Sequence, residues 1–261
     1  MNILVLLRMV PDVVEELEIA SDGRALDTEY LRMIVNESDD HALEQALILK
    51  ERRGGTVTVM AIDAPDVDDT LYSAVAKGAD RVLKIEGWDG ALTTRGAAGI
   101  FAQVIQDSVD LKPFDMVLTG VQAIDDLDAL VAPVLSHRLG LPYLAIVTKV
   151  TPDESGKAVT AVREFAGGVR GEFDVPLPAV LGIQAAEKPP RYVPVAKVRA
   201  AMKSHKIQTL SVPTMADGGL PLIEVSRMRK PQVSGHAQML DGAPDEVSKK
   251  LAGIFTERGL L

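Results

Sequence analysis

The sequence predicts an α/β fold: a doubly wound parallel sheet with antiparallel additions and an extended C-terminal arm. Three observations lead to this prediction. Short apolar runs alternate with helical patterns up to Gly140, as in βαβ units that build a parallel sheet covered on both faces. After Gly140, strand patterns follow one another mostly without helices between them. Past Pro189-Pro190 the chain has little apolar sequence from which to build a core of its own.

The first half of the chain supplies strands and helices in turn. The stretch 36–55 is predicted to be a helix with both ends marked, because Asp39 and Asp40 open it and basic residues precede Gly54. Two further helices are predicted over 67–80, ending at Gly78, and around 93–109. Apolar runs predict strands over residues 2–7, 56–62, 81–85 and 115–120.

The second half reads as strands and then as an arm. Turn signals such as Gly167-Gly168 separate four runs, 143–150, 157–165, 170–175 and 178–184, which we interpret as an antiparallel addition to the sheet. A short basic helix (196–204), a Pro/Gly-punctuated segment (213–221) and an amphipathic helix near 245–258 follow. We therefore expect residues 1–185 to form the α/β core and residues 186–261 an arm that packs on another surface.

Composition limits the classes of protein. Hydrophobic residues make up 47% and charged residues 25% of the 261 positions, as in globular chains that bury a core. No apolar run approaches the roughly 18 residues needed to cross a bilayer, and the N-terminus lacks the basic leader of a secretory signal. With no cysteine there is no disulfide, thiolate nucleophile or cysteine metal site. We expect a cytoplasmic protein that is not membrane-embedded.

The net charge of -9 argues against a nucleic-acid partner, but the charge is unevenly spread. Between Glu187 and Lys230 the chain has nine Lys or Arg against three acids. On composition alone, this stretch fits a solvated basic tail and a docking arm for an acidic partner equally well.

The stretch "GVQAIDDLDALVAPVLSHRLGLP", residues 120–142, places three carboxylates where a strand hands over to a helix. Ligands of open α/β sheets bind at the carboxyl ends of strands, close to helix N-termini that attract anions. Asp125, Asp126 and Asp128 are themselves anionic and offer no donors. Three roles remain open for them: accepting hydrogen bonds from a ribose or an adenine, capping the following helix, or coordinating Mg²⁺.

No motif predicts catalysis. The sequence lacks G-x-G-x-x-G, the P-loop, H-E-x-x-H and G-x-S-x-G, and its four histidines (41, 137, 205 and 236) have no metal spacing. Trp88 and Tyr192 could stack on a ring, although lone aromatics are more often packing residues. We predict no catalytic and no metal-binding residue, which favours a binding or carrier role over hydrolysis or group transfer.

Several ordered segments together resemble the β subunit of electron-transfer flavoproteins, over nearly the whole chain. They are "ILVLLRMVPD" (3–12), "NESDDHALEQALILKE" (36–51), "AVAKGADR" (74–81), "GVQAIDD" (120–126), "VREFAGGVRGEFDVPLPAVLGI" (162–183) and "KPPRY" (188–192) before a basic helix. The ending from "SRMRKP" resembles the C-terminal extension of some family members, which wraps around the partner subunit.

The resemblance implies an electron carrier with an α/β core of the adenine-nucleotide α-hydrolase type, rather than an enzyme with its own substrate turnover. It implies a heterodimer with an α subunit that holds most of the redox FAD, electron donation by flavin-dependent dehydrogenases, and AMP in this chain. By motif, the nucleotide would be lined by Leu6, Asn36, Glu37, Ser38, Asp39, Ile62, Gly120, Val121, Gln122, Ala123, Ile124, Asp125, Asp126, Leu127, Asp128, Ala129, Leu130 and Val131.

The chain also departs from the family pattern. Ala129, Leu130, Val131 and Ala132 replace an Asn-Gln-Thr-Gly run whose side chains donate to phosphate, so only backbone donors are expected there. Asp63 replaces a glycine, Ala166 an acid, and Glu187 an apolar anchor for partner dehydrogenases. Three alternatives follow for this chain: an electron-bifurcating variant that holds a second FAD and oxidises NADH, an empty nucleotide site, and a non-redox adenine-nucleotide-binding module.

Overall fold

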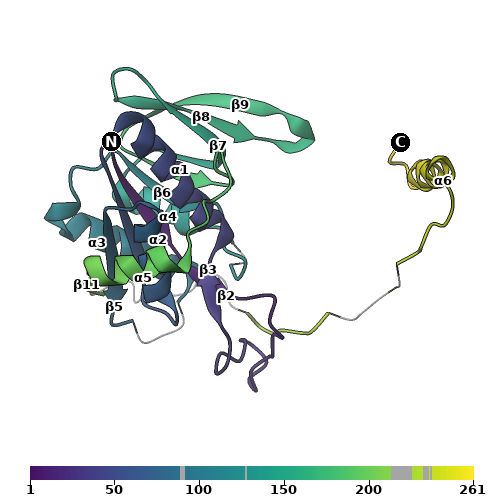
Figure 1. The fold of residues 1–261 in the computed structure, drawn as a ribbon, viewed down its shortest axis with the longest axis horizontal. Coiled ribbons are helices and arrows are strands. Elements are labelled where there is room, and N and C mark those ends of the chain that lie inside the picture. The colour runs from purple at the N-terminus through teal and green to yellow at the C-terminus, as the bar shows by residue number, and fades with distance from the viewer. Residues whose placement is uncertain (89–91, 127, 213–224, 232–234, 236) are drawn as a thin grey trace.

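A nine-stranded sheet forms the core of the computed structural model, which describes residues 1–88, 92–126, 128–212, 225–231, 235 and 237–261. Its strands run in the order β11-β5-β4-β1-β6-β10-β7-β8-β9 (Figure 1). A separate two-stranded ribbon pairs β2 (Met9–Pro11) with β3 (Met33–Val35). The sheet strands are β1 (Asn2–Leu7), β4 (Thr56–Ile62), β5 (Arg81–Glu86), β6 (Met116–Gly120), β7 (Tyr143–Pro152), β8 (Ala158–Glu164), β9 (Arg170–Pro176), β10 (Ala179–Ile183) and β11 (Gln208–Ser211).

Helices cover both faces of the parallel part of the sheet. On one face, apolar residues of α1 (Glu37–Arg53), α2 (Val67–Lys77) and α5 (Val195–Ser204) join one buried cluster with the strands. On the other face, α3 (Thr94–Asp107) and α4 (Val131–Leu139) form a second cluster around Phe101. Two short 3-10 turns precede β6 (Val109–Leu111) and β9 (Ala166–Gly168), and α6 (Pro244–Glu257) follows near the C-terminus. The α/β doubly wound prediction is confirmed.

The residues that predict helix ends lie at the ends of the observed helices. Helix α1 has Asp39 and Asp40 in its first turn and Lys50, Arg52 and Arg53 in its last, which complements the helix dipole at both ends. Helix α2 ends before Gly78, whose φ of 128° is readily adopted only by glycine.

The antiparallel prediction holds for the β7-β8 and β8-β9 pairs but is wrong for β10. Strand β10 inserts between β6 and β7 and is parallel to both, whereas β7-β8 and β8-β9 are antiparallel. The centre of the run 178–184 is apolar, and the structure buries every residue of β10. Such a continuous apolar run is usual for a strand inside a parallel sheet that is covered on both faces.

Strand β7 contains an extra residue next to β10. Ala145 pairs with Gly182 and Val147 with Ile183, so Ile146 has no opposite number on β10. Ile146 has φ of 61°, which is strained for a β-branched residue. The pairing with β8 also shifts between Val147 and Lys149. Strand β7 is therefore bulged at the carboxyl end of β10, where candidate ligand sites lie.

The C-terminal residues divide into two parts. Helix α5 packs on α2 and β11 pairs with β5 in parallel, so both lie on the core. Helix α6 lies apart from the sheet (Figure 1) and has no buried residue. The division at residue 185 stays a prediction, and the predicted segment 213–221 lies outside the described residues. Within the described chain, no helix combines the length and apolar character needed to cross a membrane.

Candidate functional site

The predicted acidic loop follows β6, at the carboxyl edge of the parallel strands and beside the end of β1. Strands β4 and β5 follow β1 on one side of it, and β6 lies on the other, so this is a topological switch point where open α/β sheets bind ligands. Asp39, at the start of α1, joins the two strand ends. Its carboxylate accepts hydrogen bonds from Gly120 N–H at 2.6 Å and from Arg8 N–H at 2.9 Å.

The backbone at Gly120 passes too close to Asp39 for a side chain at position 120. A Cβ on Gly120 would lie 2.3 Å from Ser38 Oγ and 2.5 Å from Asp39 Oδ1, so the loop after β6 can pass over the start of α1 only with a glycine there. Burial raises the pKa of Asp39, although Arg8 and the two backbone donors work against that rise. Each carboxylate oxygen of Asp39 therefore accepts a hydrogen bond from the backbone at the end of a different strand, Oδ1 from Gly120 and Oδ2 from Arg8.

Arg8 follows β1 and lies between carboxylates of two other segments, the start of α1 and the loop after β6. Its Nη1 donates to Asp126 Oδ2 at 2.7 Å, and its Nε lies 3.6 Å from Asp39 Oδ2. Burial opposes the charge of Arg8, but Asp39 and Asp126 more than offset this and raise its pKa. The side chain is only 12% exposed. The loop after β6 is thus fastened to the end of β1 by an ion pair.

Asp126 organises the loop that carries it. Its Oδ1 accepts hydrogen bonds from Ala129 N–H at 2.6 Å and Asp128 N–H at 3.1 Å, which fixes the turn before α4. Burial works to raise the pKa of Asp126, yet its bonds with Arg8 and Ala129 lower the pKa overall. Asp126 therefore stabilises the turn that precedes α4 but does not cap the helix, whose N-cap residue is Leu130 and has no side-chain cap hydrogen bond.

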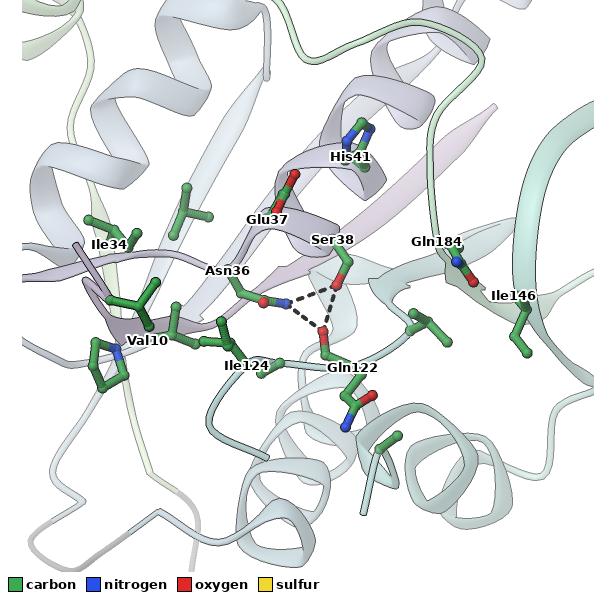
Figure 2. Close-up of a pocket in the computed structure, with 16 residues that line it drawn as sticks. Val10, Ile34, Asn36, Glu37, Ser38, His41, Gln122, Ile124, Ile146 and Gln184 are labelled. Atoms are coloured by element: carbon green, nitrogen blue, oxygen red, sulfur yellow. Dashed lines mark hydrogen bonds between the residues drawn. The ribbon is translucent and has the colours of Figure 1, made fainter. Parts of the chain in front are cut away.

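Two cavities border this edge. The larger, which we call the Ser38 pocket, has a volume of about 890 Å³. Figure 2 shows Val10 and Ile34 on one side of it, and Gln184 and Ile146 on the other. Its polar floor is tied together, because Asn36 Nδ2 and Ser38 Oγ both donate to the carbonyl oxygen of Gln122, at 3.0 and 2.6 Å.

The smaller cavity, which we call the Arg8 pocket, has a volume of about 320 Å³ and lies among the loops after β1, β4 and β5 and the start of α4. Arg8, Asp63, Trp88, Asp125 and Val131 are among its lining residues. Burial raises the pKa of Asp125. The indole Nε1 of Trp88 is buried without a hydrogen-bond partner among the described residues.

The structure brings the predicted residues to one edge but divides them between the two cavities. Ile62, Asp125 and Val131 line the Arg8 pocket. Leu127 lies outside the described residues, and the other predicted residues line the Ser38 pocket or neither cavity. The Ser38 pocket takes Asn36, Glu37, Ser38, Val121, Gln122, Ala123, Ile124 and Ala129. Neither cavity is lined by Leu6, Asp39, Gly120, Asp126, Asp128 or Leu130.

Sequence reasoning missed Arg8 as a site residue. The signal available was its position directly after β1, at the same sheet edge as the acidic loop, although the partner Asp126 is 118 positions away. In the part of the chain that the structure describes, no group of three or more His, Asp or Glu side chains is placed to hold a metal ion.

Comparison with known proteins decides the family. Residues 24–215 match the family described as the electron transfer flavoprotein domain. The chain belongs to the electron transfer flavoprotein β-subunit family. The electron transfer flavoprotein subunit beta of Methylophilus methylotrophus is 30% identical, with 98% of each chain covered. That of Bacillus subtilis is 27% identical over 98% of this chain and 97% of its own.

A third relative of this flavoprotein family is subunit CarD of the caffeyl-CoA reductase-Etf complex of Acetobacterium woodii. It is 28% identical over the full length of both chains. The resemblance drawn from the sequence motifs is therefore confirmed at the level of the β-subunit family. These matches run past residue 185 into the arm, so the arm belongs to the family pattern as well.

Proposed function

We propose that this chain is the β subunit of an electron-transferring heterodimer, which takes electrons from flavin-dependent dehydrogenases and passes them to an acceptor, and that it acts in the cytoplasm. The observation that carries the proposal is the match to electron transfer flavoprotein β subunits along 98% of the chain. The flavin of the α subunit would supply the electron chemistry. This chain would bind the partner subunit, shape the flavin surroundings and hold an adenine nucleotide.

The adenine nucleotide, AMP in our proposal, would occupy the Arg8 pocket. Its volume of about 320 Å³ lies at the small end of the range for ligand sites. The Asp125 carboxylate is an acceptor at this cavity, and Trp88 Nε1 is a donor that has no partner among the described residues. This donor set fits the hydroxyls and ring nitrogens of a nucleoside. The uncharged side chains of Ala129, Leu130, Val131 and Ala132 do not themselves provide donors to a phosphate.

The Ser38 pocket would form part of the wall beside the flavin of the α subunit. It is the larger and more open cavity, and Val10, Ile34 and Ile146 give it apolar sides. Such sides would pack against a ring system and keep water from it, while the amide of Gln184 offers a neutral donor.

The test is co-expression of the chain with the α subunit, purification of the complex, and separation of the nucleotides released on denaturation. We expect one FAD and one AMP per heterodimer, and reduction of the complex by a flavin-dependent dehydrogenase. The chain alone should be flavin-poor and redox-silent. Electron transfer by the chain without an α subunit would contradict the proposal.

The same measurement separates the remaining alternatives. Two FADs per heterodimer and hydride uptake from NADH would indicate the bifurcating variant. One FAD and no second nucleotide would mean that the Arg8 pocket is empty in the working complex. Binding of an adenine nucleotide without any flavoprotein partner would favour a non-redox module.

A further inference from the structure

Positive charge is scarce at the two cavities. Among the described residues that line them, Arg8 is the only Lys or Arg. A bound phosphate is held most strongly by charged donors, and Arg presents a fork that matches its geometry. Since the side chains of residues 129–132 are all apolar, Arg8 is the one side-chain cation available to a nucleotide phosphate here.

The guanidinium of Arg8 has donors to spare. In the described structure it makes one side-chain hydrogen bond, from Nη1 to Asp126. Its Nε lies 3.6 Å from the Asp39 carboxylate, beyond hydrogen-bond length. An Arg side chain has five N–H donors, so most of those on Arg8 remain for a ligand that enters the cavity.

The present partner of Arg8 resembles a bound anion. The Asp126 carboxylate takes the Nη1 donor of Arg8 together with the N–H groups of Ala129 and Asp128 just before α4. A phosphate near the start of α4 would seek the same kind of donors. Asp126 therefore both orients Arg8 and competes for it.

We propose that Arg8 binds the phosphate of the adenine nucleotide in the Arg8 pocket, in competition with Asp126, and thereby sets the preference of the site for AMP over adenosine. This inference rests on the proposed nucleotide site. Arg8 would take over the task that polar side chains after the loop perform in relatives with donors there, and Asp126 would limit the affinity that results.

The test compares adenosine with AMP on the full-length chain by isothermal titration calorimetry. The fluorescence of Trp88, the only tryptophan and a lining residue of the cavity, gives a second reading. We expect AMP to bind at least about tenfold more tightly than adenosine. Arg8→Gln should abolish this preference and leave adenosine binding within about twofold, whereas Arg8→Lys should keep part of it.

A second variant covers the case in which Arg8→Gln does not fold. Asp126→Asn removes the competing charge and should raise the ratio of AMP affinity to adenosine affinity several-fold. Asp69→Asn, on the exposed side of α2, makes the same change of charge away from Arg8 and should leave both affinities unchanged. Circular dichroism would confirm that each variant is folded.

Three outcomes would overturn the inference. Equal affinities of the unchanged protein for AMP and adenosine would contradict the role of Arg8 but not the presence of a nucleotide site. Equal gains from Asp126→Asn and Asp69→Asn would mean that general charge, and not the Arg8 contact, sets the preference. Binding of neither ligand would remove the nucleotide site itself, while the heterodimer would still be tested separately by co-expression.

Discussion

At the scale of single residues, the closest approach in the site is that of Gly120 to the start of α1. Ser38 Oγ, Asp39 Oδ1 and Asp39 N all lie within 2.7 Å of the place where a Cβ would stand. Asp39 N belongs to the backbone and cannot move aside without shifting α1. Glycine at position 120 is therefore required by the crossing of two chain segments.

Gly120→Ala should lower the free energy of unfolding by about 2 kcal/mol or more, because an added methyl group forces two elements apart and strains the Asp39 bonds. Urea unfolding followed by circular dichroism would measure this. Gly253→Ala is the matched control, since nothing lies within 4 Å of a Cβ there and alanine favours the exposed helix α6. Equal stability of the two variants would contradict the role of Gly120.

The roles of individual residues could be predicted only in part. The acidic loop was correctly placed at the end of a strand and Asp39 at the start of a helix, because strand ends and helix starts are marked in the sequence. That Asp39 directs both oxygens to backbone N–H groups was not predictable, since the donors at Arg8 and Gly120 come from distant strands. Arg8 was missed for the same reason.

At the scale of elements, helix α1 holds the segment 186–191 along its length. Arg191 donates to Glu44 and Glu51, and Glu187 pairs with Arg52 through two hydrogen bonds of 2.9 Å. Glu187, which stands where relatives were expected to have an apolar anchor, is thus bound to this chain's own helix. Its side chain is only 16% exposed.

The pH dependence of the stability of Glu44→Gln tests the ion pair between Glu44 and Arg191. Burial works to raise the pKa of Glu44, but its bonds with Arg191 lower it overall from 4.5. A lowered pKa means that Glu44 contributes stability above the unfolded-state value of about 4.5, and that this is lost as the pH falls through the folded-state value. We expect the variant to be roughly 1 to 2 kcal/mol less stable at pH 7.

The difference between the variant and the unchanged protein should shrink as the pH falls below about 4.5, as followed by thermal or urea unfolding at several pH values. Glu51→Gln serves as the control, because Glu51 contacts the same Arg191 from an exposed position and should matter much less. A constant difference at all pH values would argue against the ion pair.

Elements with marked ends were predictable, and their order in the sheet was not. Charged first and last turns located α1, and Gly78 located the end of α2. Strand β11 was not predicted, since its four residues alternate weakly and only pairing with β5 makes them a strand. The place of β10 between β6 and β7 depends on long-range packing that local patterns do not encode.

At the scale of the whole molecule, α6 is an amphipathic helix without a surface to lie on. Leu251 and Phe255 are 39% and 43% exposed, and α6 is separate from the core in Figure 1. The preceding described residues run beside the loop between β2 and β3, where Lys230 pairs with Glu18. If residues 186–261 are the arm that we propose, α6 should find its surface on the α subunit.

A chain that ends at residue 242 should keep the melting temperature of the core, because α6 buries no residue of its own. It should bind the α subunit at least about tenfold more weakly, since apolar side chains lose their partner surface. Biolayer interferometry would give the affinity. Phe255→Asp should weaken binding in the same direction, whereas Thr256→Asp, next to it on the helix, should have little effect.

The bulge in β7 has a consequence for chain length. Because Ala145 and Val147 already meet consecutive residues of β10, a protein without Ile146 would pair the same partners in an unbroken ladder. The faces of the strand would keep their alternation, and the positive φ would disappear. What such a shortened protein would lose is the side chain that Ile146 contributes to the Ser38 pocket. We therefore expect deletion of residue 146 to leave folding unchanged and to alter only the binding of the molecule that occupies the Ser38 pocket.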